Sequence, residues 1–184
     1  VMEVTRSWIR IFVFVAGPLV LLSYAYGLSR MEDKASLWGG IPSSWVPYIV
    51  PFMFLAAIGF LMYWWITLFQ LDMDHLHSFR WPWSESDGNG MNRLFLGFAL
   101  FLLASALWLE STLFHMSNDY SWTPFLVIGV LFVASLGNVL MGLLAYAAYQ
   151  DGVPGAGLML VGTIMLGIQV ILNDLIVWSY KFPW

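Results

Sequence analysis

The chain has 184 residues, of which 60% are hydrophobic and 10% charged, with a formal net charge of -4 and no cysteine. A soluble domain has about 45 to 50% apolar and about 25% charged residues, so this composition excludes an aqueous globule. The small net charge gives no indication of a nucleic-acid partner, and the lack of cysteine excludes disulfides, thiolate nucleophiles and thiolate metal sites. The eleven tryptophans indicate membrane interfaces, where this side chain gathers.

Five apolar stretches are long enough to cross a bilayer, whose hydrocarbon core of about 30 Å takes about 20 helical residues. In chain order, the predicted helices cover residues 8–28, 45–71, 94–116, 124–149 and 157–180. Polar linkers separate them, the longest at residues 29–44 and 72–93. The sequence therefore predicts an all-α, five-helix transmembrane bundle, a single domain over residues 1–184 that crosses the lipid bilayer several times.

Five crossings place the two termini on opposite sides of the membrane. We call the side where the first helix begins side A, and the other side B. Side A carries four basic residues and side B three, so the positive-inside rule favours a cytoplasmic side A by a margin of one charge. The side A residues are Arg6, Arg10, Arg80 and Arg93, and the side B residues are Arg30, Lys34 and Lys181.

Two acids interrupt the apolar stretches. Glu110 and Asp174 each lie six residues before the side B end of their predicted helix, about 9 Å below that boundary at about 1.5 Å per residue. An acid inside a membrane is costly and is by default a candidate functional residue. We expect the two acids to interact directly or through one water; alternatively, each bonds a neighbouring helix or reaches the interface.

Small and amide residues follow helical spacing in the last two predicted helices. Ala134, Asn138 and Gly142 recur every four residues, and residues 157–180 carry two adjoining stripes. Such stripes are typical of helix packing. The stripes consist of Gly162, Leu166, Gln169 and Asn173, and of Thr163, Gly167, Asp174 and Trp178.

Aromatic residues of several segments gather toward side B. They form either an interfacial belt or the wall of a pocket for a flat, apolar ligand that has few polar contacts. On the pocket interpretation, the candidate ligand-binding residues are Glu110, Asp174, Asn173, Trp108, Trp178, Trp45, Tyr24 and Trp38.

A second polar group lies in the run LDMDHLH, with Asp72, Asp74, His75 and His77. Carboxylate and imidazole ligands suit a divalent metal, but a solvated helix end has the same composition and the spacing matches no metal motif. His115 lies five residues past Glu110, about 140° around a helix, and is expected at the interface. No hydrolase, Walker or dinucleotide motif is present, so the sequence indicates no catalytic residue.

Two segments carry a family resemblance: Ile41-Pro42-Ser43-Ser44-Trp45-Val46, and the last helix from Ala156-Gly157-Leu158 to Leu172-Asn173-Asp174-Leu175-Ile176. There the chain resembles the tryptophan-rich sensory protein and translocator protein (TspO-like) family of five-helix membrane proteins. The chain departs from the family in two places. The family's Trp-Ser/Thr-Pro element, which belongs on its third helix, appears here as Trp122-Thr123-Pro124 at the start of the fourth predicted helix. The tyrosine-containing signature that the family has early in its fifth helix is absent. The resemblance implies binding of tetrapyrroles or sterol-like lipids in a pocket closed by the first loop.

The predicted role is to bind, and to pass on, an apolar or planar ligand near side B, with a lipid or tetrapyrrole as the candidate bound group. The alternative is a non-catalytic accessory subunit that packs on membrane-complex partners or on copies of itself. A third hypothesis is a proton-coupled transporter or membrane enzyme that uses Glu110 and Asp174.

Overall fold

The computed structural model describes residues 4–184, which are helical and contain no strand. Five helices are long and apolar enough to cross a membrane, which confirms the predicted all-α, five-helix bundle. The elements in order are α1 (Arg6–Ser29), the 3₁₀ turn η1 (Lys34–Trp38), α2 (Val46–Trp65) with its π-helical continuation η2 (Ile66–Gln70), α3 (Met73–Ser78), α4 (Gly90–Asn118), α5 (Thr123–Gln150), and α6 (Ala156–Gly167) with its continuations η3 (Ile168–Trp178, π-helical) and α7 (Ser179–Lys181).

Local sequence explains where the spanning helices begin and end. The Thr5 side chain caps α1 by accepting the Trp8 N–H at 3.2 Å, and α2 and α5 begin with a proline in the first turn, where its missing N–H has no helical partner to lose. Helix α4 ends at Asp119, whose positive φ of 46° is the left-handed conformation that terminates helices. Both α1 and α2 continue through an internal proline.

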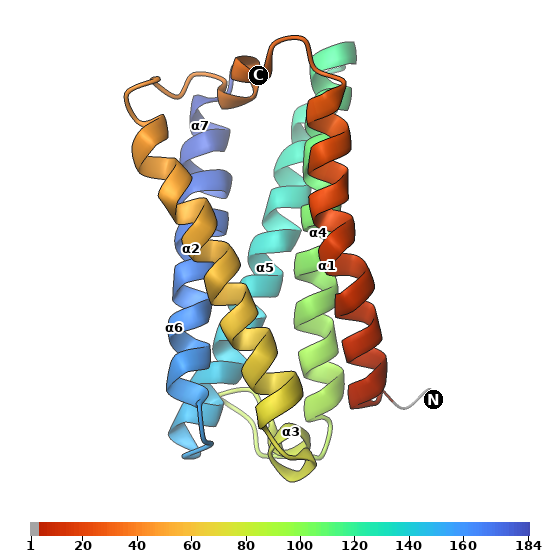
Figure 1. Ribbon diagram of the computed structural model, residues 1–184, viewed down its shortest axis with the longest axis vertical. Coiled ribbons are helices and arrows are strands. Elements are labelled where there is room, and N and C mark those ends of the chain that lie inside the picture. The colour runs from red at the N-terminus through yellow and green to blue at the C-terminus, as the bar shows by residue number, and fades with distance from the viewer. Residues whose placement is uncertain (1–3) are drawn as a thin grey trace.

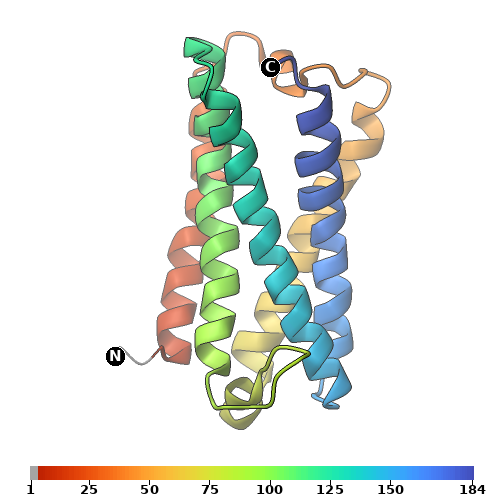
Figure 2. The ribbon, with the colours of Figure 1, turned by 180° about the vertical axis from the view of Figure 1, so that it is seen from behind.

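The helices pack in the order α1, α4, α5, α6 and α2, so that α1 and α2 occupy the two ends of the series. In Figure 1, α1 and α2 are nearest at the side A end, drawn at the bottom, and diverge toward side B. Figure 2, from the opposite side, shows α5 in front, crossing from α4 toward α6. At side A, Arg6 and Arg10 of α1 donate to the carbonyl oxygens of Leu71 and Leu68, at 2.6 and 2.9 Å.

Glycines permit the closest helix contacts. A Cβ built on Gly59 of α2 would overlap the carbonyl oxygen of Gly162 of α6, and one built on Gly137 of α5 would meet the Phe101 backbone of α4. On the predicted α5 stripe, Asn138 lies against Gly167 of α6. Asn138, Gly162 and Gly167 of the predicted stripes therefore lie at helix contacts, as expected of packing residues.

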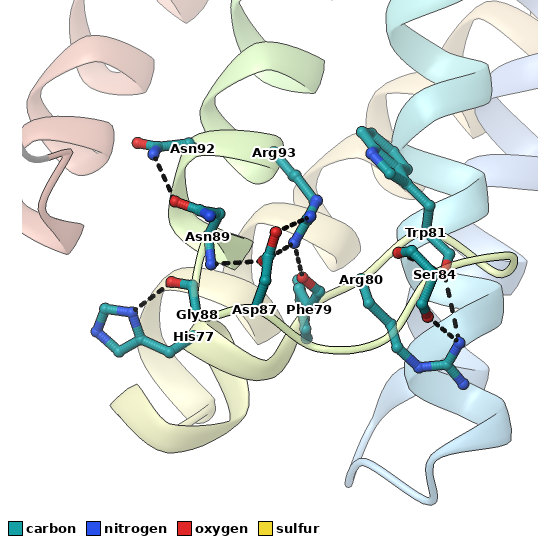
Figure 3. Close-up of polar contacts among 10 residues, drawn as sticks. All are labelled: His77, Phe79, Arg80, Trp81, Ser84, Asp87, Gly88, Asn89, Asn92 and Arg93. Carbon is teal, nitrogen blue, oxygen red and sulfur yellow. Dashed lines mark hydrogen bonds and ion pairs between the residues drawn. The ribbon is translucent and has the colours of Figure 1, made fainter.

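The side A linker is more ordered than the predicted polar loop, because it contains α3 and a network of arginine contacts (Figure 3). Arg93 donates to both Asp87 oxygens, at 2.6 and 2.7 Å, and to the Phe79 carbonyl at 3.0 Å. Arg80 forms a two-pronged pair with Asp151 of the α5–α6 turn, at 2.7 and 2.8 Å. These pairs attach the linker to the start of α4 and to the α5–α6 turn.

Candidate ligand-binding site

A cavity of about 250 Å³ lies at the side B end of the bundle. Residues of α1, η1, α2, α4 and η3 line it, whereas α5 and α6 contribute none. Its lining residues are Tyr24, Leu28, Lys34, Leu37, Trp38, Ile41, Ile49, Met53, Trp108, Leu109, Gln169, Asn173, Asp174 and Trp178.

The polar part of the cavity is a chain of three side chains on η3. Asn173 Nδ2 donates to Gln169 Oε1 at 3.1 Å, and Gln169 Nε2 donates to Asp174 Oδ1 at 2.7 Å. In an α-helix, residues five apart would be separated by about 140°. The π-helical i→i+5 winding of η3 brings them to one face instead. Gln169 of one predicted stripe and Asp174 of the other therefore meet on the face of η3 that lines the cavity.

Two oxygen atoms of these three polar side chains have no hydrogen-bond donor among the described residues. Within residues 4–184, neither Asp174 Oδ2 nor Asn173 Oδ1 receives a hydrogen bond from another side chain or from the backbone. Gln169 is buried, while Asn173 and Asp174 are partly accessible. The cavity thus presents two acceptor oxygens from one short segment of helix.

Aromatic rings form much of the wall. The Trp108 ring forms T-shaped pairs with the rings of Tyr24 and Trp178. The centroid distances are 5.8 and 5.6 Å, and the interplanar angle is 75° in both pairs. The Trp108 indole N–H is buried and has no hydrogen-bond partner in the described part of the chain. Trp38 packs onto the same cluster from η1. This wall suits a flat or ring-containing molecule.

The η1 segment covers the cavity on side B and is fastened to the C-terminal end of the bundle. Trp178 Nε1 donates to the Leu37 carbonyl at 2.7 Å, and the Gly40 N–H donates to the Lys181 carbonyl at 2.9 Å. Asp33 caps η1 by accepting the Ala35 N–H at 2.9 Å. Hydrogen bonds therefore hold η1 in place over the side B end of the cavity.

Six of the eight predicted ligand-binding residues line this cavity: Tyr24, Trp38, Trp108, Asn173, Asp174 and Trp178. Glu110 does not, because it forms an ion pair with Arg30, which follows the end of α1. Trp45 does not either; it precedes α2 with 44% of its surface exposed, 5.6 Å from the Lys181 ammonium.

The two acids, expected to interact directly or through one water, share no direct hydrogen bond within residues 4–184, and only Asp174 lines the cavity. Equal depth does not place two groups on facing surfaces, and the long Arg30 side chain supplies Glu110 with a basic partner from outside the predicted helices.

Sequence reasoning missed Lys34 and Gln169 as lining residues. Lys34 lies in a linker, whose path a helical period does not predict. Gln169 belonged to a packing stripe, and its contact with Asp174 depends on the π-helical winding. The remaining missed residues are aliphatic: Leu28, Leu37, Ile41, Ile49, Met53 and Leu109.

Three of the four residues weighed as metal ligands have other contacts, and the fourth, Asp74, is exposed in the first turn of α3. Asp72 accepts the His75 N–H at 2.9 Å as the cap of α3 and contacts the His75 ring at 2.7 Å. His77 Nδ1 lies 3.3 Å from the Gly88 carbonyl, as Figure 3 shows. Across residues 4–184, no three His, Asp or Glu side chains are grouped closely enough to hold a metal. The His75 N–H and ring keep the pKa of Asp72 below its usual value.

His115 is buried at the side B end of α4. Its Nδ1 lies 2.7 Å from Thr123 Oγ1, which itself donates to the Tyr120 carbonyl at 2.7 Å. Because the threonine proton is used there, His115 Nδ1 carries the proton in its own bond. His115 therefore fastens α4 to the start of α5 and takes no part in the cavity.

A larger hollow of about 540 Å³ lies between α4 and α5. Its lining is apolar throughout: Ala99, Leu100, Leu103, Ala104, Leu107, Phe125, Leu126, Gly129, Val130 and Val133. It has no polar group to orient a ligand, whereas ligand sites combine apolar walls with a few placed polar groups. The side B cavity is therefore the better candidate.

Five spanning helices define an integral, multi-pass membrane protein whose apolar outer surface is compatible with bilayer contact. Comparison of the chain with family models, with curated proteins and with solved structures finds no match.

Proposed function

We propose that the protein binds a small, largely apolar molecule with a ring system in the side B cavity and passes it on from the membrane. The observation that supports this most is a single one: the cavity combines an aromatic wall with a short polar chain at one end. That combination is the usual composition of a small-molecule site, where apolar surface supplies affinity and a few polar groups fix orientation.

The cavity volume limits the size of the ligand. About 250 Å³ lies just below the range of about 300 to 1,000 Å³ typical of small-molecule sites. A ring-containing lipid, or part of a sterol-like molecule, fits this limit better than a whole tetrapyrrole, which would require η1 to move. A tetrapyrrole is therefore the less favoured ligand of the proposal.

The arrangement of α1 and α2 supports entry from the bilayer. These helices diverge toward side B (Figure 1), and residues of both line the cavity. Met53 of α2 lines the cavity and is 45% exposed. Since η1 is hydrogen-bonded over the side B end, the route that we propose for the ligand runs between α1 and α2.

We also propose that the chain is related to the tryptophan-rich sensory protein and translocator protein family. The support is the place of η1, which covers the cavity where the resemblance puts the closing loop. The proposal requires no catalytic step.

The test is to fill the cavity. Ile49 is buried and lines it, whereas Leu55, on the same helix, is exposed and does not. We expect Ile49→Phe to lose a small molecule that copurifies with the wild-type protein in mild detergent, and Leu55→Phe to retain it, as measured by absorbance and by mass spectrometry of an organic extract. Equal retention in both variants would contradict the proposal, and a stably copurifying protein instead of a small molecule would favour the accessory-subunit alternative.

A further inference from the structure

We infer that the side B cavity selects molecules that carry a protonated amine on an aromatic or alicyclic body, with the Asp174 carboxylate as the group that holds the ammonium. This inference rests on the proposed function, and it adds the charge of the ligand, which the volume of the cavity does not specify.

Hydrogen-bond polarity at Asp174 favours a ligand that brings donors. The polar chain from Asn173 through Gln169 ends at the Asp174 carboxylate, which accepts from Gln169 through Oδ1 and keeps Oδ2 without a hydrogen bond within residues 4–184. A carboxylate has only acceptors, so a ligand that binds it must supply a donor. An ammonium has up to three donors and no acceptor, whereas a ligand carboxylate has only acceptors.

Asp174 also lacks a counter-charge. Glu110, Asp87 and Asp151 each form an ion pair with an arginine, but Asp174 forms none within residues 4–184. A carboxylate in a membrane-spanning segment is costly when no opposite charge accompanies it. An ammonium placed beside it supplies the charge and the hydrogen bond together, and a charge-assisted bond of this kind is stronger than a neutral one.

The aromatic wall also favours a cationic ligand. Trp108 packs against both Tyr24 and Trp178 in near-perpendicular pairs at the cavity. Aromatic ring faces attract a cation, and indole does so most strongly. The wall therefore favours a positively charged ligand, as the Asp174 carboxylate does, whereas a wall of leucines would be indifferent to charge.

Lys34 is the only other residue with a charged side chain among those that line the cavity. It is exposed on η1, so water and salt screen its charge more than that of a buried group. Its position at the aqueous edge disfavours a cation that enters from water. A lipophilic amine dissolved in the bilayer reaches Asp174 between α1 and α2 without passing it.

The test compares three probes with one ring system: naphthylethylamine, naphthylethanol and naphthylacetate. Binding to the full chain in detergent is measured by equilibrium dialysis at neutral pH, where the amine is protonated, with protein-free micelles as the partition blank. We expect the wild-type protein to prefer the amine to the alcohol by about tenfold or more, equivalent to about 1.4 kcal/mol, and to bind the carboxylate most weakly.

Asp174→Asn should keep the hydrogen bond from Gln169 and reduce amine binding to the level of the alcohol. The matched control is Glu110→Gln, which removes the other intramembrane acid, outside the cavity, and should leave the preference unchanged. Equal binding of all three probes, or an amine preference that survives Asp174→Asn, would overturn the inference and leave the cavity as a binding site. Failure of all three probes to bind would overturn both the inference and the proposed function.

Discussion

The contact between α2 and α6 gives the sharpest prediction for stability. Gly59 and Gly162 face each other there, and a Cβ on Gly59 would meet the Gly162 carbonyl oxygen and lie 2.9 Å from Met165 Cβ. Backbone atoms cannot rotate away as a side chain can. We expect Gly59→Ala to separate the two helices slightly, with an overpacking cost of about 1 to 3 kcal/mol.

The same substitution also has a favourable part, because alanine is better than glycine in a helix interior by about 0.5 to 1 kcal/mol. Gly129→Ala measures that part alone, since nothing lies within 4 Å of a Cβ on Gly129. The difference between the two variants therefore isolates the overpacking cost. The assay is reversible unfolding in mixed micelles, followed by circular dichroism.

The reciprocal variant Gly162→Ala should cost a similar amount, and the double variant should cost less than the sum of the two, because both substitutions separate the same pair of helices. If Gly59→Ala is as stable as Gly129→Ala, the close approach of α2 and α6 is wrong. The placement of Ile49 relative to η3 across the cavity would then need revision as well.

Three further outcomes are expected. Asp174→Asn should leave the unfolding free energy nearly unchanged, whereas Asp174→Leu strips the acceptor from Gln169 Nε2 and should cost about 1 to 3 kcal/mol; equal melting temperatures for the two would count against the polar chain. Trp178→Phe removes the bond to the Leu37 carbonyl and should cost about 0.5 to 1.5 kcal/mol, with faster proteolysis in the linker that contains η1; unchanged cleavage would show that this bond does not fasten η1. The pKa of Asp87 is held well below its usual value by its arginine partner and a backbone N–H. Its contribution to the free energy of unfolding is therefore complete above the ordinary carboxyl pKa of about 3.9 and is lost as the pH falls toward the lower folded value. Asp87→Asn should flatten that part of the curve of stability against pH, and an unaltered acid profile would refute the ion pair.

The spanning helices could be predicted from the sequence because each is an apolar stretch of bilayer length. Most of the candidate site could also be predicted, since aromatic residues of separate segments gathered at one depth together with Asn173 and Asp174. The direction in which each residue faces around its helix axis was harder to predict than its depth in the membrane. Helical period and depth placed Glu110 level with Asp174, but its partner Arg30 comes from beyond the end of α1.

The π-helical winding of η3 was the other feature that the sequence did not reveal. With about 3.6 residues per turn, Gln169 and Asp174 belong to different stripes, and the stripe of Gln169 suggested packing. Their hydrogen bond accompanies the π-helical winding that begins after Gly167, which an α-helical period does not predict. Lys34 was missed for a related reason, because the fold of a linker over a cavity has no periodic signature.

The central claim is that the side B cavity holds a discrete small molecule. The most direct measurement is photo-crosslinking from a benzophenone side chain placed at Trp38, which lines the cavity, and at Tyr48, which is 74% exposed in the first turn of α2 near the same membrane face. After irradiation in native membranes, intact-mass spectrometry should show one defined small-molecule adduct at position 38 and a mixture of bulk phospholipid adducts at position 48. The same phospholipid mixture at both positions would contradict the claim.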